Sequence, residues 1–206
     1  MGVGCGSPLA IACAQHFPKS VLAGTGTVCG TGAWAAGMEG IAWFRRLLLY
    51  LRANAPSPAR SLIDEPFVLS LQKRPDKFCR YIERDSALKR RTYGIGLGPD
   101  GALPANLNIE VDGNNKRFLE AFRGGAEGIE ADGRILVGDW GFELQDVDSN
   151  AVRIYWGDQD TTVARAGQVY MAKKIRNATL TIFPGDSNYS IPSHYYKKIL
   201  GEILVL

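Results

Sequence analysis

Apolar and polar positions form their clearest pattern near the C-terminal end of the chain, where they predict two strands and two helices. Val152–Trp156 and Thr179–Phe183 are apolar runs of strand length, whereas residues 163–175 and 193–205 carry helical patterns. Each expected strand is followed by an expected helix. This order predicts a parallel sheet whose strands are connected through helices.

The N-terminal part predicts one helix and one strand. Pro8–His16 is apolar and rich in small residues after a glycine-rich turn, and proline is favoured in the first turn of a helix. Pro18 ends this expected helix. Ser20–Gly24 predicts a short buried strand, and the Gly- and Thr-rich stretch Thr25–Gly37 predicts a loop.

The middle of the chain predicts several short helices. Between residues 38 and 91, apolar residues recur at steps of three and four, beginning with Ile41, Phe44, Leu48 and Leu51. Prolines interrupt this region and divide it, because proline disrupts the interior of a helix.

The remaining middle segments complete a division into three parts. Residues 94–113 are rich in Gly, Pro and Asn and predict a loop, and residues 116–128 are helical again. We therefore expect a core segment over 1–33, a helical insertion over 34–145 and a second core segment over 146–206.

The charge pattern gives no indication of a nucleic-acid partner. The net charge is only +3 on 206 residues. The basic residues occur in short groups, at Lys89–Arg91, Lys173–Lys174 and Lys197–Lys198. Groups of this size are typical of solvated helix faces, whereas a nucleic-acid footprint is more basic and more clustered.

The cysteines predict neither a disulfide framework nor a metal site. The chain has four, at positions 5, 13, 29 and 79, with no CxxC pairing and no histidine at metal-ligand spacing. They are typical of thiols in a reducing compartment. We expect no metal and no cofactor.

No segment predicts export or membrane insertion. The N-terminus has no basic region before its apolar stretch, so a secretory signal is not expected. The apolar run Leu47–Leu51 is far too short to span a bilayer. The pattern predicts a cytoplasmic protein without a membrane partner.

Four segments, in this order along the chain, carry a family resemblance. Gly2–Pro8 (GVGCGSP) resembles a nucleophile elbow, and Glu120–Val147 resembles a connection from cap to core. Val152–Val163 resembles a strand ending at a Trp-Gly turn with an aspartate after it, and Pro184–Ile191 resembles a loop that normally reads Gly-His-Phe-Ser. Together they resemble the α/β-hydrolase superfamily, in particular its serine-hydrolase and esterase-like members.

The resemblance implies a fold and a chemical class. It implies a partial α/β-hydrolase fold: a small, mainly parallel sheet with flanking helices and a helical cap over residues 34–145. It also implies descent from hydrolases of small-molecule esters or related carboxyl bonds. In such enzymes a histidine takes the nucleophile's proton, a carboxylate orients the histidine, and backbone N–H groups stabilise the oxyanion.

Carried onto this sequence, the catalytic positions are incomplete. Gly4 lies at the nucleophile position and Asn188 at the histidine position, while Asp160 lies at the acid position. Glycine has no side chain with which to attack, and an amide does not shuttle protons near neutrality. The backbone N–H of Cys5 lies at an oxyanion position. We therefore expect lost or much reduced catalysis; another interpretation of Asp160 is a carboxylate that caps the loop before the next helix.

Two other functions stay open. Cys5, flanked by Gly4 and Gly6, is an alternative nucleophile, and Ser7 is a weaker one. The spacing to Pro8 fits the family only with Gly4 at the nucleophile position. Cys5 also lacks a base, since His16 is expected at the far end of its helix and His194 on the closing helix. The other function is a non-catalytic module that binds a small apolar ligand under the cap or a protein partner.

The N-terminal end adds a further expectation. Only Met1 precedes Gly2, and at most three core strands are predicted, near 20–24, 152–156 and 179–183. A parallel sheet of this size has an exposed edge. Either the sequence is N-terminally truncated, or the edge is covered by a rearranged cap, a second copy or another partner.

Overall fold

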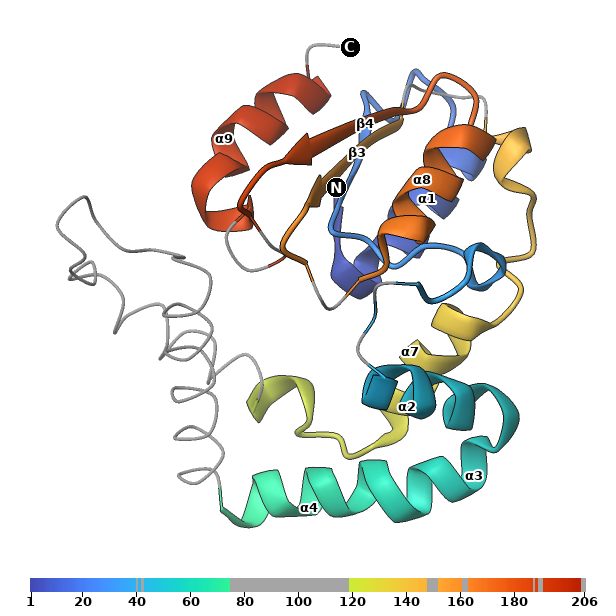
Figure 1. Ribbon diagram of the computed structural model, residues 1–206, viewed down its shortest axis with the longest axis vertical. Coiled ribbons are helices and arrows are strands. Elements are labelled where there is room, and N and C mark those ends of the chain that lie inside the picture. The colour runs from blue at the N-terminus through green and yellow to red at the C-terminus, as the bar shows by residue number, and fades with distance from the viewer. Residues whose placement is uncertain are drawn as a thin grey trace, which may run out of the picture. The chain divides into compact units, whose positions relative to one another are not determined.

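The chain forms a small parallel sheet with helices on both faces, and a helical segment lies between the second and third strands in the sequence (Figure 1). This computed structural model describes residues 1–39, 41, 43–74, 119–147, 152–160, 163–186, 188 and 191–204. Within these residues the expected α/β class is confirmed.

The sheet has four strands in the order β1-β2-β3-β4. They are β1 (Gly2–Val3), β2 (Thr25–Val28), β3 (Val152–Gly157) and β4 (Thr179–Phe183), and every neighbouring pair is parallel. Strand order thus follows chain order. The strands expected at 152–156 and 179–183 are confirmed.

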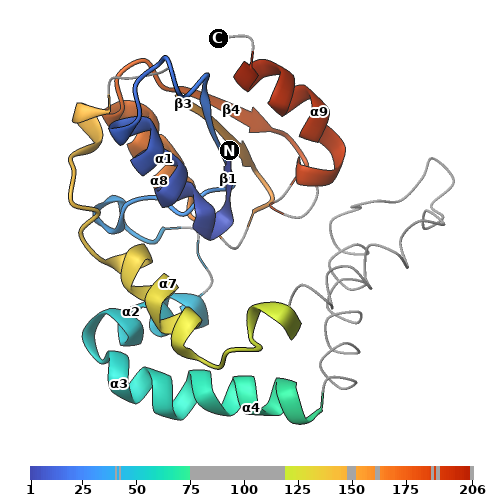
Figure 2. The same ribbon diagram turned by 180° about the vertical axis from the view of Figure 1, so that it is seen from behind.

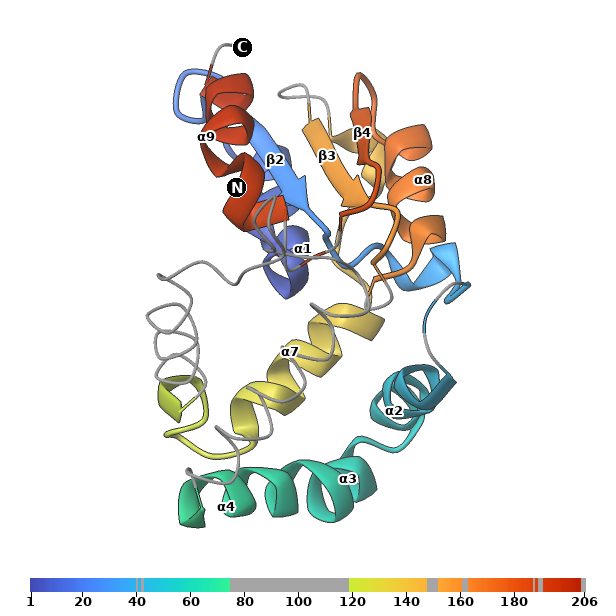
Figure 3. The same cartoon turned by 60° about the vertical axis from the view of Figure 1, so that its left-hand side comes forward.

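Side chains of β3 enter two cores, and the alternation of a strand directs Val152 and Ile154 to one face of the sheet and Tyr155 to the other. Val152 and Ile154 pack with side chains of α1 (Ser7–His16) and α8 (Arg165–Lys174). Tyr155 packs on the opposite face with side chains of α9 (Ile191–Leu204). Figure 2 shows α1 beside α8, and Figure 3 shows α9 and α8 on opposite sides of the strands.

The chain divides into two compact units. Met1–Leu49 and Arg134–Leu206 form the sheet unit, and Tyr50–Gly133 form the helical unit. In the described part of the chain between β2 and β3, the helices include α2 (Trp43–Asn54), α3 (Pro56–Ala59), a π-helix (Arg60–Asp64), α4 (Glu65–Lys73) and α7 (Glu127–Val137). Short 3₁₀ turns among the described residues include η1 (Gly4–Gly6), η2 (Trp34–Ala36) and η4 (Leu144–Asp146).

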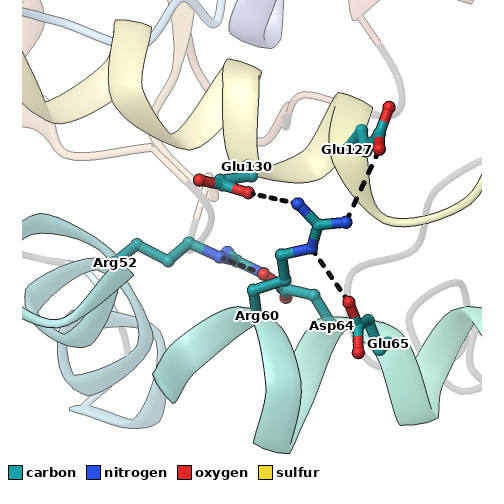
Figure 4. Close-up of polar contacts among 6 residues, drawn as sticks. All are labelled: Arg52, Arg60, Asp64, Glu65, Glu127 and Glu130. Carbon is teal, nitrogen blue, oxygen red and sulfur yellow. Dashed lines mark hydrogen bonds and ion pairs between the residues drawn. The ribbon is translucent and has the colours of Figure 1, made fainter. Parts of the chain in front are cut away.

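Ion pairs connect the helices of the helical unit (Figure 4). Arg60 contacts Glu65 at 2.9 Å, and Glu130 on α7 at 3.0 Å. Arg52 on α2 pairs with Asp64, whose side chain is only 3% exposed. The π-helix carries both Arg60 and Asp64, so this irregular turn supplies one member to each ion pair.

The expected strand at 20–24 is wrong, and so is the expected loop beginning at Thr25. The backbone N–H groups of Val21 and Leu22 donate to the carbonyl of Pro18, which makes a turn, and the strand is β2. Its glycine content has a packing cause: a Cβ at Gly26 would collide with the side chain of Ile203 on α9. The sequence analysis therefore expected too few strands, because the hydrophobic pattern predicted neither β1 nor β2.

The expected helix at 116–128 is also wrong in part. Of its described residues, 119–121 are helical, but a turn follows and Gly125 has φ +98°. Helix α7 begins only at Glu127. The loop expected at 94–113 and the C-terminal part of the helical region expected over 38–91 lie outside the described residues.

No helix among the described residues combines the length and the apolar character needed to cross a bilayer.

Candidate functional site

The chain makes a sharp strand-to-helix turn at its N-terminus. Strand β1 ends at Val3, Gly4 has φ +55°, and α1 begins at Ser7 after the short turn η1. Only glycine adopts this left-handed conformation without strain. The turn is tightly packed, since a Cβ at Gly2 would collide with the backbone of Gly6 and lie 2.8 Å from the Cα of Ser7.

Side chains on this turn differ in their accessibility. A Cβ built at Gly4 meets no atom within 4 Å, so this position faces open space. Cys5 is exposed. Ser7 is fully buried, and its hydroxyl donates to the carbonyl of Gly2 at 3.3 Å. The left-handed position of this turn therefore carries a residue with no side chain.

Asp160 is buried directly after β3. It is 6% exposed, and its Oδ1 accepts the backbone N–H of Val163 at 3.1 Å, as expected of a carboxylate that caps the loop before α8. Burial, followed by the negative charge of Asp160, raises the pKa of Cys29 well above its usual range, so this thiol stays protonated.

The positions at 4, 160 and 188 follow three different strands of one parallel sheet. Gly4 follows β1, Asp160 follows β3, and Asn188 lies in a half-buried turn between β4 and α9. Since carboxyl ends of parallel strands share one edge, these residues belong to the same edge of the sheet.

Sequence reasoning missed a polar cluster at this edge. Asp186, 8% exposed, lies after β4 and contacts His194 Nδ1 through Oδ1 at 3.3 Å. Its Oδ2 accepts the hydroxyl of Tyr195 at 3.0 Å. The backbone N–H of Gln159 donates to the Asp186 carbonyl at 2.9 Å, which connects the loops after β3 and β4. The signal available in the sequence was an aspartate eight positions before a histidine at the start of a helix.

The other histidine lies elsewhere. His16 is the last residue of α1, an exposed side chain whose ring meets that of Phe142 edge-on at 6.2 Å. About 14 Å of helix separates it from the start of α1, given a rise of about 1.5 Å per residue. His16 is therefore too far away to act as a base for a group on the turn at Gly4, which agrees with its expected place at the far end of the helix.

One cavity of the sheet unit has aromatic walls. Its volume is about 320 Å³, within the range of small-molecule pockets. Trp34, Trp140, Phe142 and Tyr170 line it, with Lys174 at 5.8 Å from the centre of the Tyr170 ring. The indole N–H of Trp140 donates to the carbonyl of Ile135 at 2.9 Å, which fixes one wall.

No cluster of three or more His, Cys, Asp or Glu side chains within the described ranges is arranged to hold a metal ion.

Comparison with known proteins identifies the fold through structure alone. The sequence matches no protein-family model, and it matches no curated protein sequence. BpoC from Mycobacterium tuberculosis H37Rv, provisionally described as a non-heme bromoperoxidase, is similar over 98% of this chain and 66% of its own, with a TM-score of 0.51 and 11% identity. A hydrolase from Oleispira antarctica, olei00960, is similar over 99% and 62%, with a TM-score of 0.49 and 13% identity.

These similarities concern the fold. The chain spans about two thirds or less of the length of these two structures, 66% and 62%. Together with the order and direction of its four strands, the likeness to BpoC shows that the chain has part of the α/β-hydrolase fold, as its sequence motifs implied.

Proposed function

We propose that this chain is an α/β-hydrolase-like protein descended from hydrolases of small-molecule esters or related carboxyl bonds, with covalent catalysis lost or much reduced. The observation that supports this most directly is the backbone at Gly4. Its φ of +55° places the apex of the β1–α1 turn at a residue without a side chain. The proposal assigns the vacated nucleophile to Gly4, the vacated histidine to Asn188 and the retained acid to Asp160.

The size of the loss follows from how these groups work together. A nucleophile and its base act as a unit, and in a well-studied serine protease removing either one lowers kcat by about 10⁶. Asn188 does not accept a proton near neutrality. The family position for the histidine that Asp160 would orient holds Asn188, and Asp160 Oδ1 accepts the N–H of Val163. Under this proposal the chain therefore forms no acyl-enzyme.

Cys5 is the alternative nucleophile, and the turn disfavours it. The left-handed residue is Gly4, which begins the 3₁₀ turn Gly4–Gly6, whereas Cys5 is the second residue of that turn and is not left-handed. A nucleophile elbow holds its nucleophile at the strained apex. A Cys5-dependent hydrolase would need a base that reaches the thiol from another element.

Ester hydrolysis with p-nitrophenyl butyrate tests the proposal. We expect no initial burst of p-nitrophenolate, because no acyl-enzyme forms, and an unchanged rate in Cys5→Ala. Cys13→Ala on α1 is the matched control. A burst that Cys5→Ala abolishes and Cys13→Ala retains would overturn the proposal in favour of a cysteine hydrolase.

A second candidate function is non-catalytic binding of a small apolar molecule, supported by the aromatic cavity. Two of the four tryptophans, Trp34 and Trp140, line it, so a bound aromatic ligand should quench their fluorescence. Titration with naphthalene provides the probe. Trp140→Ala should abolish saturable quenching, and Trp43→Ala, on the exposed start of α2, should retain it. Equal quenching in both variants would dismiss this candidate.

A partner at the sheet edge is a proposal of the same kind. β1 is an edge strand of two residues, and Val3 is 43% exposed. Light scattering across a concentration series tests for a second copy: a Val3→Lys variant should weaken any dimer, since charge on an edge strand opposes pairing.

A further inference from the structure

The Asp186–His194 contact has the geometry of a base held by its orienting acid. Asp186 Oδ1 lies 3.3 Å from Nδ1 of His194, and Asp186 is buried. The histidine side chain is 44% exposed. With Nδ1 facing the carboxylate, the other ring nitrogen, Nε2, faces away from it. Catalytic hydrogen bonds of this kind are often long before substrate binds.

Two further contacts hold the carboxylate in place. Tyr195 donates its hydroxyl to Asp186 Oδ2 at 3.0 Å, and the Tyr195 ring stacks on Phe183 with 4.2 Å between centroids. The Asp186 backbone is fixed by Gln159, whose N–H donates to its carbonyl. Both carboxylate oxygens are therefore engaged, and the acid is part of a rigid support for the imidazole.

The direction of α9 places this pair at the carboxyl edge of the sheet. Ile203, near the C-terminal end of α9, lies over Gly24 and Gly26 at the start of β2. His194 is in the first turn of α9, so it lies at the opposite end, where the strands finish. The turn at Gly4 and the loop of Asn188 belong to that same edge.

We propose that Asp186 and His194 form a general-base dyad that activates water for attack on small activated esters, independently of the vacated positions at Gly4 and Asn188. In this step His194 Nε2 accepts a proton from water while the water oxygen bonds to the ester carbonyl carbon. The resulting intermediate then expels the alkoxide or phenoxide, which takes the proton from Nε2. The products are one carboxylic acid and one alcohol or phenol, and no covalent enzyme intermediate forms.

The tautomer of His194 gives a test that does not depend on turnover. If Asp186 accepts from Nδ1, neutral His194 carries its proton on Nδ1 and leaves Nε2 as an acceptor. The chain has only two histidines, so His16 is an internal control in a ¹⁵N spectrum of the imidazoles. We expect the Nδ1–H form for His194 alone. An Nε2–H form for His194 would overturn the proposal.

Turnover of p-nitrophenyl acetate provides the second arm. His194→Ala should lower the protein-dependent rate by about 10²-fold, the usual contribution of a general base, and His16→Ala should leave it unchanged. The wild-type rate should also show a normal solvent deuterium isotope effect that Asp186→Asn diminishes, whereas a purely structural clamp would leave the isotope effect unaltered. Equal rates in the two histidine variants, or no wild-type turnover above buffer, would overturn the dyad.

The outcomes separate this inference from the proposed function. A Cys5-dependent burst contradicts the loss of covalent catalysis and leaves the His194 tautomer to be judged by its own spectrum. Turnover that requires His194 and shows no burst supports both the proposed function and the dyad.

Discussion

Replacing Gly4 by alanine isolates the backbone conformation on which the account of the turn rests. A Cβ at Gly4 meets nothing within 4 Å, so the substitution adds no steric clash. What it adds is the left-handed strain at φ +55°, about 1–2 kcal/mol for a residue with a Cβ. Loss of glycine's freedom in the unfolded chain offsets about 0.4–1 kcal/mol of this.

The expected net destabilisation by Gly4→Ala is therefore about 1 kcal/mol, which lowers Tm by about 2–4 °C in a chain of this length. Gly6→Ala is the matched control. It also meets no atom within 4 Å, but its φ is −75°. Here only the unfolded-state effect remains, so we expect stabilisation of about 0.4–1 kcal/mol.

Thermal unfolding of both variants by circular dichroism measures the contrast. Gly4→Asn should fall closer to wild type than Gly4→Ala, because asparagine tolerates the left-handed region better. Equal shifts for Gly4→Ala and Gly6→Ala would refute the reasoning, since the two positions differ in backbone conformation and not in available space.

Three other predictions concern the core, the buried thiol and the vacated positions. Ile154→Ala, fully buried on β3, should destabilise by about 2–5 kcal/mol in urea unfolding, against at most about 1 kcal/mol for Ile182→Ala, which is 39% exposed on β4. Because burial raises the pKa of Cys29, the folded chain keeps a proton that the unfolded chain loses above about pH 8.5; stability should fall as pH rises beyond that value, and less steeply in Cys29→Ala. Gly4→Ser with Asn188→His should hydrolyse p-nitrophenyl butyrate with a burst that neither single variant shows, because nucleophile and base act as a unit.

Local pattern was sufficient to predict the C-terminal half of the sheet unit. β3 and β4 are continuous runs of strand-forming residues. The helices that follow them, α8 and α9, begin and end within two residues of the expected limits. β2 was missed for a physical reason. Its one glycine, Gly26, and Gly24 just before it lie against Ile203 of α9, and this close packing between distant segments selects against the larger side chains that are typical of a strand.

The candidate site divides in the same way. The glycine-rich turn before α1 was predictable because its small residues and the helix are consecutive in the chain, whereas β1, with only two residues, was not predicted. The Asp186–His194 contact depends on how the loop after β4 is held against the loop after β3, through Gln159. A search for acids at family positions finds Asp160, and the spacing of eight residues between Asp186 and His194 does not by itself show that the two side chains are in contact, which the three-dimensional structure does.

The most direct test of the central claim is to look for an acyl group on the turn itself. The chain is quenched during reaction with p-nitrophenyl acetate, and the peptide covering residues 1–19 is examined by mass spectrometry for an ester or thioester adduct. Because the apex residue is Gly4, the account predicts that the folded chain carries no more of this adduct than the unfolded chain does. A stoichiometric adduct on Cys5 or Ser7 would contradict it.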